Sequence, residues 1–139
     1  MRTTCALLIA FALPLNAAPV PKEVRAGDAA RLLGEWHLTE AKYGEADYAA
    51  IGTKWTFGAD GKALRDRPNE GLGTAAYKID PSAAAKTFDW ETGEGTLFHG
   101  VYELDGDAFK VVLVLGTEER PAACRPIEGG YHFTFRRAK

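Results

Sequence analysis

The feature that most constrains the fold of this chain is an alternation of apolar and polar residues, interrupted at short intervals by turn-forming dipeptides. A period of two residues is typical of β-strands with one buried face. Asp60-Gly61 and Asp105-Gly106 are strong hairpin signals, and Gly129-Gly130 precedes the last apolar run. The pattern predicts eight strands: Glu35–Tyr43, Thr53–Phe57, Ala63–Arg67, Thr74–Ile79, Lys86–Glu91, Thr96–Leu104, Ala108–Leu115 and Tyr131–Arg137.

Short, evenly spaced strands joined by tight turns predict an all-β fold, either an antiparallel sandwich or a closed barrel. Hairpin links between successive strands favour the barrel, because closure removes exposed sheet edges. A short helix over Asp28–Leu33 precedes the first strand and stops at Gly34. We therefore predict an eight-stranded antiparallel up-and-down barrel with a short N-terminal helix, formed by residues 28–139.

Composition excludes several classes of protein. The chain has 139 residues, 46% of them hydrophobic and 26% charged, with 17 basic and 19 acidic residues and a formal net charge of −2. These values fit one globular domain and argue against fibrous repeats and intrinsic disorder. A dedicated nucleic-acid binder usually carries a basic face. We therefore expect a monomeric domain that does not bind nucleic acid.

The first residues have the pattern of a secretory signal peptide. Arg2 supplies a positive charge, Cys5–Leu13 form a short apolar run, and Ala17 is a small residue suited to cleavage. The run is too short to span a membrane, and Cys5 lies at its start, whereas a lipoprotein cysteine lies at the end of such a run. A buried N-terminal helix is the alternative. We expect cleavage after Ala17, an extended leader over residues 18–27, and a secreted or periplasmic protein without a membrane span or lipid anchor.

Alternation within the strands predicts which side chains face the interior. On the last strand Tyr131, Phe133 and Phe135 share one face with Arg137, and Trp55 shares a face with Phe57. Each aromatic side chain buries about 150–250 Å². An eight-stranded barrel with this interior is expected to be largely filled by its own side chains.

No residue pattern in the chain predicts catalysis or metal binding. His37 and His132 each follow or precede an inward aromatic residue, so both are expected to face solvent, and His99 is also out of phase with the interior. Side chains on different outer faces cannot converge on one ion, so we predict no metal and no cofactor. Cys124, the single thiol after signal removal, lacks an activating motif. The carboxylates are interpreted as solvated surfaces: Asp89 with Glu91, and Glu103 with Asp105 and Asp107.

The most specific motif opens the first strand. Gly34-Glu35-Trp36 follows the predicted helix, and Arg137 lies on the inward face of the last strand. This arrangement resembles lipocalin-like barrels, in which an arginine of the closing strand covers a G-x-W tryptophan at the barrel base. The guanidinium would stack on the indole and bond to nearby carbonyls. Gly34, Trp36 and Arg137 are therefore predicted to close one end of a lipocalin-like barrel.

The resemblance extends along the chain from Leu32 to Arg137. It is similar to a largely uncharacterised lipocalin-like domain family that is common among secreted proteins of planctomycete-type bacteria. The blocks that carry the resemblance are LLGEWHLTEAKYG, KWTFGADGKA, AAYKIDPSAAAKTFDW, FHGVYELDGDAFKVVLV and ERPAAC. It implies a fold and an exported setting, and it supplies no catalytic residues.

The leading functional hypothesis is that the open end of the barrel binds a small apolar or amphipathic ligand. Trp55 and Trp90 would line the walls, and three tyrosines would present hydroxyls to the polar end of the ligand: Tyr77, Tyr102 and Tyr131. The segment Tyr43–Gly52 is a candidate lid.

The alternative is a filled barrel that acts through a protein partner, such as a secreted protease inhibitor or an envelope scaffold. The stiff segment Ala18–Lys22 would enter a groove of the partner. An enzyme is the third hypothesis, since residues that converge from separate strands are not visible in one sequence.

Overall fold

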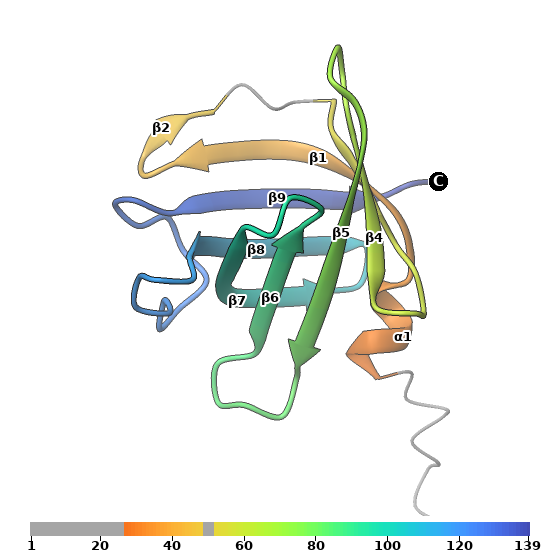
Figure 1. The fold of residues 1–139 in the computed structure, drawn as a ribbon. Helices are drawn as coiled ribbons and strands as arrows, with labels where there is room; N and C mark the ends of the chain where they lie inside the picture. Colours follow the sequence, from red (N-terminus) through yellow and green to blue (C-terminus); the bar gives the residue numbers. More distant parts are fainter. Residues whose placement is uncertain (1–26, 49–51) are drawn as a thin grey trace, which may run out of the picture.

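Alternating side chains and glycine-containing turns give nine strands and one helix in the residues that the computed structural model describes, 27–48 and 52–139 (Figure 1). The helix α1 (Asp28–Leu32) precedes the strands β1 (Gly34–Tyr43), β2 (Ala46–Asp47), β3 (Lys54–Phe57), β4 (Lys62–Arg67), β5 (Gly71–Asp80), β6 (Thr87–Thr92), β7 (Leu97–Asp105), β8 (Ala108–Leu115) and β9 (Tyr131–Arg137). The predicted signal peptide and nearly all of the predicted leader lie outside the described residues. In the described part of the chain, no helix has the length and apolar character needed to cross a membrane.

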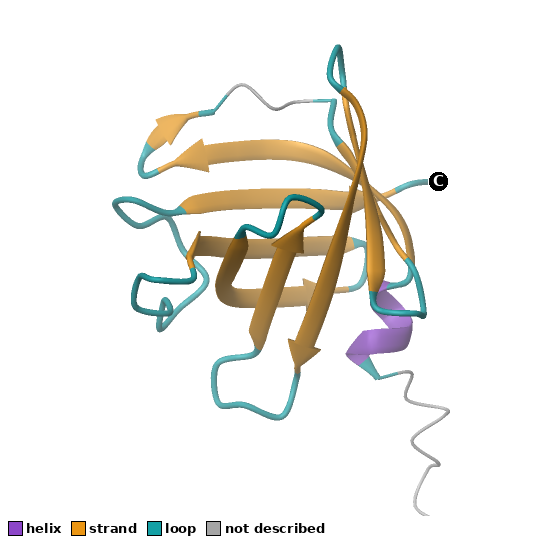
Figure 2. Cartoon of the chain, viewed as in Figure 1, coloured by secondary structure: helices purple, strands orange, loops and turns teal. Residues whose placement is uncertain are grey.

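The strands form one closed antiparallel barrel. Each strand from β3 to β8 pairs with the next, β1 pairs with β3, and pairing of β1 with β9 closes the circle (Figure 2). The predicted all-β, eight-stranded, lipocalin-like barrel with a short N-terminal helix is confirmed. The short strand β2 is an addition that alternation did not predict, and it extends the sheet by a hairpin with the end of β1.

The interior is packed with aromatic rings. Trp36, Phe88, Phe109 and Phe135 are fully buried and lie in one continuous core. Phe109 and Phe135 stack with ring centres 5.6 Å apart. Offset and edge-on ring pairs of this kind add about 0.5–1.5 kcal/mol each beyond their buried area. The half of the barrel nearest α1 is therefore filled by its own side chains.

A second apolar group lies on the outside of the barrel. Val101, Val112 and Val114 face away from the interior core, yet each is at most 4% exposed. The connection between β8 and β9 covers this face, and Arg120 in that connection donates to the Gly100 carbonyl at 2.8 Å. Outer valines that face a covering segment extend the core beyond the barrel wall.

His132 belongs to this covered outer face. It pairs with Val112 and is only 8% exposed, so the prediction that it faces solvent is wrong. Alternation identified its outward direction but not the segment that covers it. Burial lowers the pKa of His132 and leaves its Nδ1 without a partner among the described residues.

Candidate functional site

One end of the barrel is closed by Trp36 and Arg137. Trp36 Nε1 donates to the Leu32 carbonyl at 2.8 Å, and the Arg137 guanidinium lies 4.3 Å from the centre of the indole ring. Arg137 also donates to the carbonyls of Leu33, at 2.9 Å, and Arg31. Gly34 has a φ of +105°, which lets the chain turn from α1 into β1 beside the guanidinium.

A buried carboxylate fastens α1 to the same end. Asp28 accepts hydrogen bonds from Lys86 Nζ and the Tyr102 hydroxyl, each at 2.8 Å, and from Arg31. Burial alone would raise the pKa of Asp28, but the bonds from Lys86, Tyr102 and Arg31 outweigh it and bring the pKa down to about 2. Asp28 is therefore ionised at neutral pH and accepts a hydrogen bond from each of three side chains, those of Lys86, Tyr102 and Arg31. The charged groups at the closed end, Asp28 and Arg137, are therefore paired within the protein.

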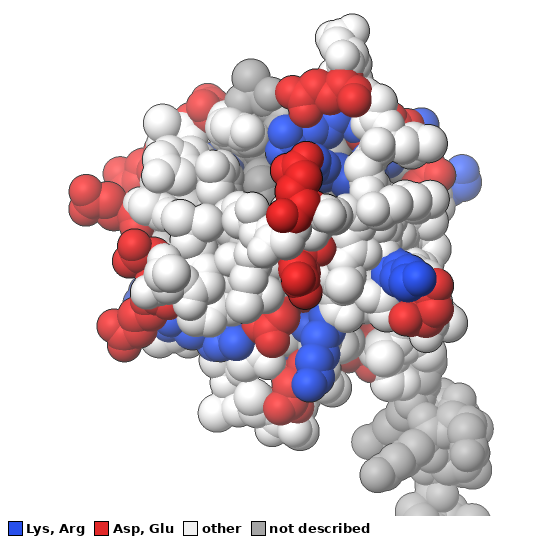
Figure 3. Space-filling model, in the orientation of Figure 1, with Lys and Arg blue, Asp and Glu red and all other residues white. Residues whose placement is uncertain are grey.

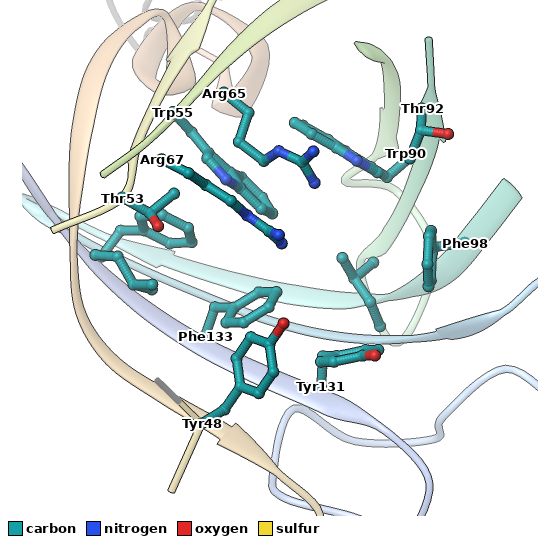
Figure 4. Close-up of a pocket in the computed structure, with 13 residues that line it drawn as sticks. Tyr48, Thr53, Trp55, Arg65, Arg67, Trp90, Thr92, Phe98, Tyr131 and Phe133 are labelled. Atoms are coloured by element: carbon teal, nitrogen blue, oxygen red, sulfur yellow. The ribbon is translucent and has the colours of Figure 1, made fainter. Parts of the chain in front are cut away.

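The opposite end holds a cavity of about 100 Å³ (Figure 4). Trp55 of β3 and Trp90 of β6 form one wall, with ring centres 4.2 Å apart and planes 16° from parallel. Phe133 and Tyr131 of β9 lie across from them, and the Tyr48 ring contacts Tyr131 at 5.6 Å. The walls of the cavity are therefore mostly aromatic, and they come from strands that are distant in the sequence.

Two arginines enter this aromatic cavity. Arg65 and Arg67 alternate with outward residues on β4, and both border the cavity, with their guanidinium groups directed into it in Figure 4. Arg65 pairs with Trp55 across the β3–β4 hairpin, so the register that turns Trp55 inward also turns Arg65 inward. A long cationic side chain usually extends to solvent. Here two cationic side chains instead border an aromatic cavity.

Glycines on the neighbouring strand lie across from both arginines. Arg65 pairs with Gly73 and Arg67 pairs with Gly71. A Cβ at position 73 would lie 3.5 Å from Arg65 Nη2, an ordinary contact, and a Cβ at position 71 would meet no atom within 4 Å. Gly73 therefore lies against the Arg65 guanidinium, outside the set of residues that line the cavity.

The polar groups of the cavity are incompletely paired. Arg67 Nη1 donates to Glu70 at 3.1 Å, while Arg67 Nε is buried without a partner among the described residues. The Thr53 hydroxyl, which also borders the cavity, is buried and unpaired in the same set of residues. Within residues 27–48 and 52–139, no hydrogen bond or ion pair holds the Arg65 guanidinium. An unpaired buried polar group costs about 1–3 kcal/mol, so such groups are uncommon in folded proteins.

The surroundings of Arg65 disfavour its positive charge. Burial, followed by the adjacent charge of Arg67, lowers the pKa of Arg65, and Glu70 and Glu94 act in the opposite direction. Figure 3 shows basic side chains in a hollow at the upper edge of the barrel, near the end of β4 and the start of β5, with acidic side chains beside them. Arginine stays protonated at neutral pH even so. The cavity is therefore a cationic recess with a mixed-charge rim.

The structure separates the five residues that the sequence predicts as ligand-binding. Trp55, Trp90 and Tyr131 come together around the cavity. Tyr77 donates its hydroxyl to the Gly58 carbonyl at 2.6 Å, and Tyr102 donates to Asp28 in the closed end. Both tyrosines follow the predicted inward phase, but their hydroxyls bond toward the closed end, and neither residue borders the cavity. The predicted lid, Tyr43–Gly52, includes β2 and Tyr48, and its residues 49–51 lie outside the described residues.

The remaining candidates lie away from the cavity. Cys124 is half-buried in the β8–β9 connection, where burial, and then Glu103, raise the pKa of the thiol to about 12. A thiol with this pKa is protonated at neutral pH and is a poor nucleophile. Asp89 forms an ion pair with Arg120 at 2.8 Å on the outer surface.

Sequence reasoning missed Arg65, Arg67 and Thr53. The signal for the arginines was present: Ala63–Arg67 was predicted as a strand, and the Asp60-Gly61 hairpin places Arg65 across from Trp55. The G-x-W motif draws attention to Arg137 as an inward arginine, but no motif draws attention to Arg65 or Arg67. In comparisons with known proteins, the chain matches no family model and no curated protein.

Proposed function

We propose that this protein is an exported lipocalin-like binding protein that holds a small amphipathic ligand at the open end of its barrel. The observation that carries the proposal is the aromatic cavity between the Trp55–Trp90 stack and Phe133, with unpaired polar groups on its wall. Concave sites with apolar walls and a few convergent polar groups are the usual form of small-molecule sites.

The size of the cavity sets the size of the ligand. A dry engineered cavity of about 150 Å³ holds a benzene molecule. The present cavity, about 100 Å³, is open to solvent and therefore suits one ring or a short chain whose polar end reaches the mouth. Sterols, haem and long fatty acids exceed this volume, because rings such as Phe109 and Phe88 occupy the deeper barrel.

A thermal-shift screen tests this proposal. We expect small aromatic and short-chain amphiphiles to raise the melting temperature, and sterols and haem to leave it unchanged. Thr92→Trp, on the wall of the cavity, should fill the space and abolish the shifts. Thr74→Trp places the same ring on the exposed outer side of β5 and serves as the control. No shift with any small compound, or equal shifts in wild type and Thr92→Trp, would contradict the proposal.

A filled barrel that acts through a protein partner is the second candidate. The closed half of the molecule favours it, because Trp36, Phe88 and Phe109 leave that half solid. Assays of secreted proteases with and without the protein test the inhibitor form. Inhibition that survives in Thr92→Trp would favour the partner-binding function over the ligand-binding one.

The exported setting is supported by the N-terminal pattern of Arg2 and the apolar run Cys5–Leu13. Family membership is proposed on the sequence blocks between Leu32 and Arg137 and on the lipocalin-like fold. Mass spectrometry of the extracellular or periplasmic fraction tests export. A mature chain that begins at Ala18 is the expected result, and an intact chain retained in the cytoplasm would contradict it.

A further inference from the structure

We infer that Arg65 and Arg67 form a carboxylate site, so that the ligand of the barrel is a small carboxylic acid with an apolar ring or short chain. The inference rests on the proposed function and specifies the class of ligand. Its grounds are the placement of two cations among aromatic rings, their incomplete pairing, and the charge balance of the recess.

The two guanidinium groups reach the cavity from one strand, two residues apart, and therefore lie on the same face. Like charges on neighbouring side chains repel, and the aromatic walls weaken the screening that water would provide. A guanidinium presents a planar fork of donors that matches a carboxylate. A carboxylate placed between Arg65 and Arg67 would relieve their repulsion and satisfy the unpaired Arg67 Nε.

Glu70 shows that the site accepts a carboxylate. Its side chain, 63% exposed, approaches Arg67 Nη1 at 3.1 Å from the rim. Arg65, Arg67 and Glu70 together carry one positive charge, and the other acid that acts on Arg65 is Glu94. Because Glu70 and Glu94 offset the charge of the two arginines, a carboxylate monoanion suits the recess better than a phosphate dianion.

The rest of the cavity fits the body of such an acid. Trp55 and Trp90 offer flat apolar walls, and Phe133 lies across from them. The buried Thr53 hydroxyl is a second hydrogen-bonding group for the polar end of a ligand. Phe135 and Leu113 also border the cavity, so a ring can lie on apolar side chains while its carboxylate meets the arginines.

The test uses benzoate, its neutral analogue benzamide, and inorganic phosphate as probes of the purified protein. Binding is followed by calorimetry and by fluorescence of the Trp55–Trp90 wall. We expect benzoate to bind, and benzamide and phosphate to bind at least about 10-fold more weakly, since charge-assisted hydrogen bonds contribute about 1.5–3 kcal/mol and 1.4 kcal/mol is tenfold.

Variants identify the groups that bind the carboxylate. Arg65→Gln and Arg67→Gln should each weaken benzoate binding by about 10- to 100-fold. Arg136→Gln removes the same charge from the exposed outer face of β9 and should leave binding within about twofold. Glu70→Gln frees Arg67 from its ion pair and should strengthen binding.

The outcomes separate this inference from the proposed function. Equal binding of benzamide and benzoate, unaffected by Arg65→Gln, overturns the carboxylate site and leaves ligand binding in the barrel intact. Phosphate binding as tight as benzoate also overturns it, because the aromatic walls would then contribute nothing. If none of the probes binds and the thermal-shift screen is also negative, the proposed function fails as well.

Discussion

Both ends of the barrel place arginine side chains beside tryptophan, but the hydrogen-bond donors of the arginine are more completely paired within the protein at the closed end. At the closed end, Arg137 stacks on Trp36 and its donors meet the carbonyls of Leu33 and Arg31. At the open end, Arg65 and Arg67 also lie beside tryptophan, but their donors are largely unpaired among the described residues. An arginine with its partners supplied by the chain contributes to stability. An arginine without such partners gains little of this stabilisation, and under the proposed function its donors meet a ligand.

The contrast also explains the distribution of the aromatic residues. The rings near α1 pack against each other without space for a ligand, whereas Trp55 and Trp90 border the cavity. One aromatic core therefore supports both the closed end and the proposed binding surface. The predictions below follow from this difference and proceed from the largest expected effect to the smallest.

Replacing Trp36, which closes the barrel, should have the largest effect on the free energy of unfolding. Trp36→Ala removes a fully buried ring and its bond to the Leu32 carbonyl, and should cost about 3–5 kcal/mol of unfolding free energy in urea titrations. Trp90→Ala should cost less, because that ring already borders a cavity. Equal losses, or a larger loss for Trp90→Ala, would remove the distinction between the two ends.

A matched pair of arginine variants tests the contrast directly. Arg137→Gln loses the stack on Trp36 and bonds to backbone carbonyls, and should cost about 2 kcal/mol of unfolding free energy. Arg65→Gln removes no internal bond among the described residues and should change stability by less than about 0.5 kcal/mol. Urea unfolding of both variants measures this difference. Similar losses in the two proteins would show that both arginines are structural.

Acid should weaken the closed end. The pKa of Asp28 is about 2 in the folded protein against an ordinary value of 3.8, so its contribution is fully present above the unfolded pKa and is lost as pH falls toward the folded pKa. The half-exposed Lys86 and Arg31 side chains are screened by solvent, which reduces the expected loss between about pH 5 and pH 2 to about 1–2 kcal/mol.

Asp28→Asn provides the control for this pH dependence. The variant lacks the titrating carboxyl and should show a flatter stability profile between about pH 5 and pH 2. Urea unfolding at several pH values gives both profiles. Parallel curves for wild type and Asp28→Asn would mean that Asp28 does not link acid to stability.

The smallest expected effect is a gain at the open end. Arg67→Met keeps an apolar stem in the cavity and removes the buried, unpaired Nε, so thermal unfolding should show equal or higher stability, by up to about 1 kcal/mol. Arg136→Met, on the exposed outer face, should have almost no effect. A loss above about 1 kcal/mol in Arg67→Met would place Arg67 in the same structural class as Arg137.

Local patterns predicted the fold well because the alternation of apolar and polar residues within a strand shows which of its side chains face the interior. The hairpin dipeptides, and the inward phase of Phe133 and Phe135, were sufficient to predict a closed antiparallel barrel. The burial of His132 was not predictable in this way, because it depends on the long β8–β9 connection folding over the outer face.

The candidate site was predicted only in part. Trp55, Trp90 and Tyr131 were expected around the ligand, and they do border the cavity. Tyr77 and Tyr102 share the inward phase, but depth along the barrel depends on strand register and decides which end a side chain reaches. Predicting that Arg65 and Arg67 border the cavity requires the register of both the β3–β4 and the β4–β5 pairs. These registers place Arg65 across from Trp55, and both arginines across from glycines.

The most direct test compares the arginines of the two ends in one sample. Side-chain ¹⁵N NMR resolves the Nε–H groups of Arg65, Arg67 and Arg137, and benzoate is added in steps. We expect saturable shifts of the Arg65 and Arg67 signals and an unchanged Arg137 signal. Unchanged Arg65 and Arg67 signals at saturating benzoate, or equal shifts of all three, would contradict the assignment of the open end as the binding site.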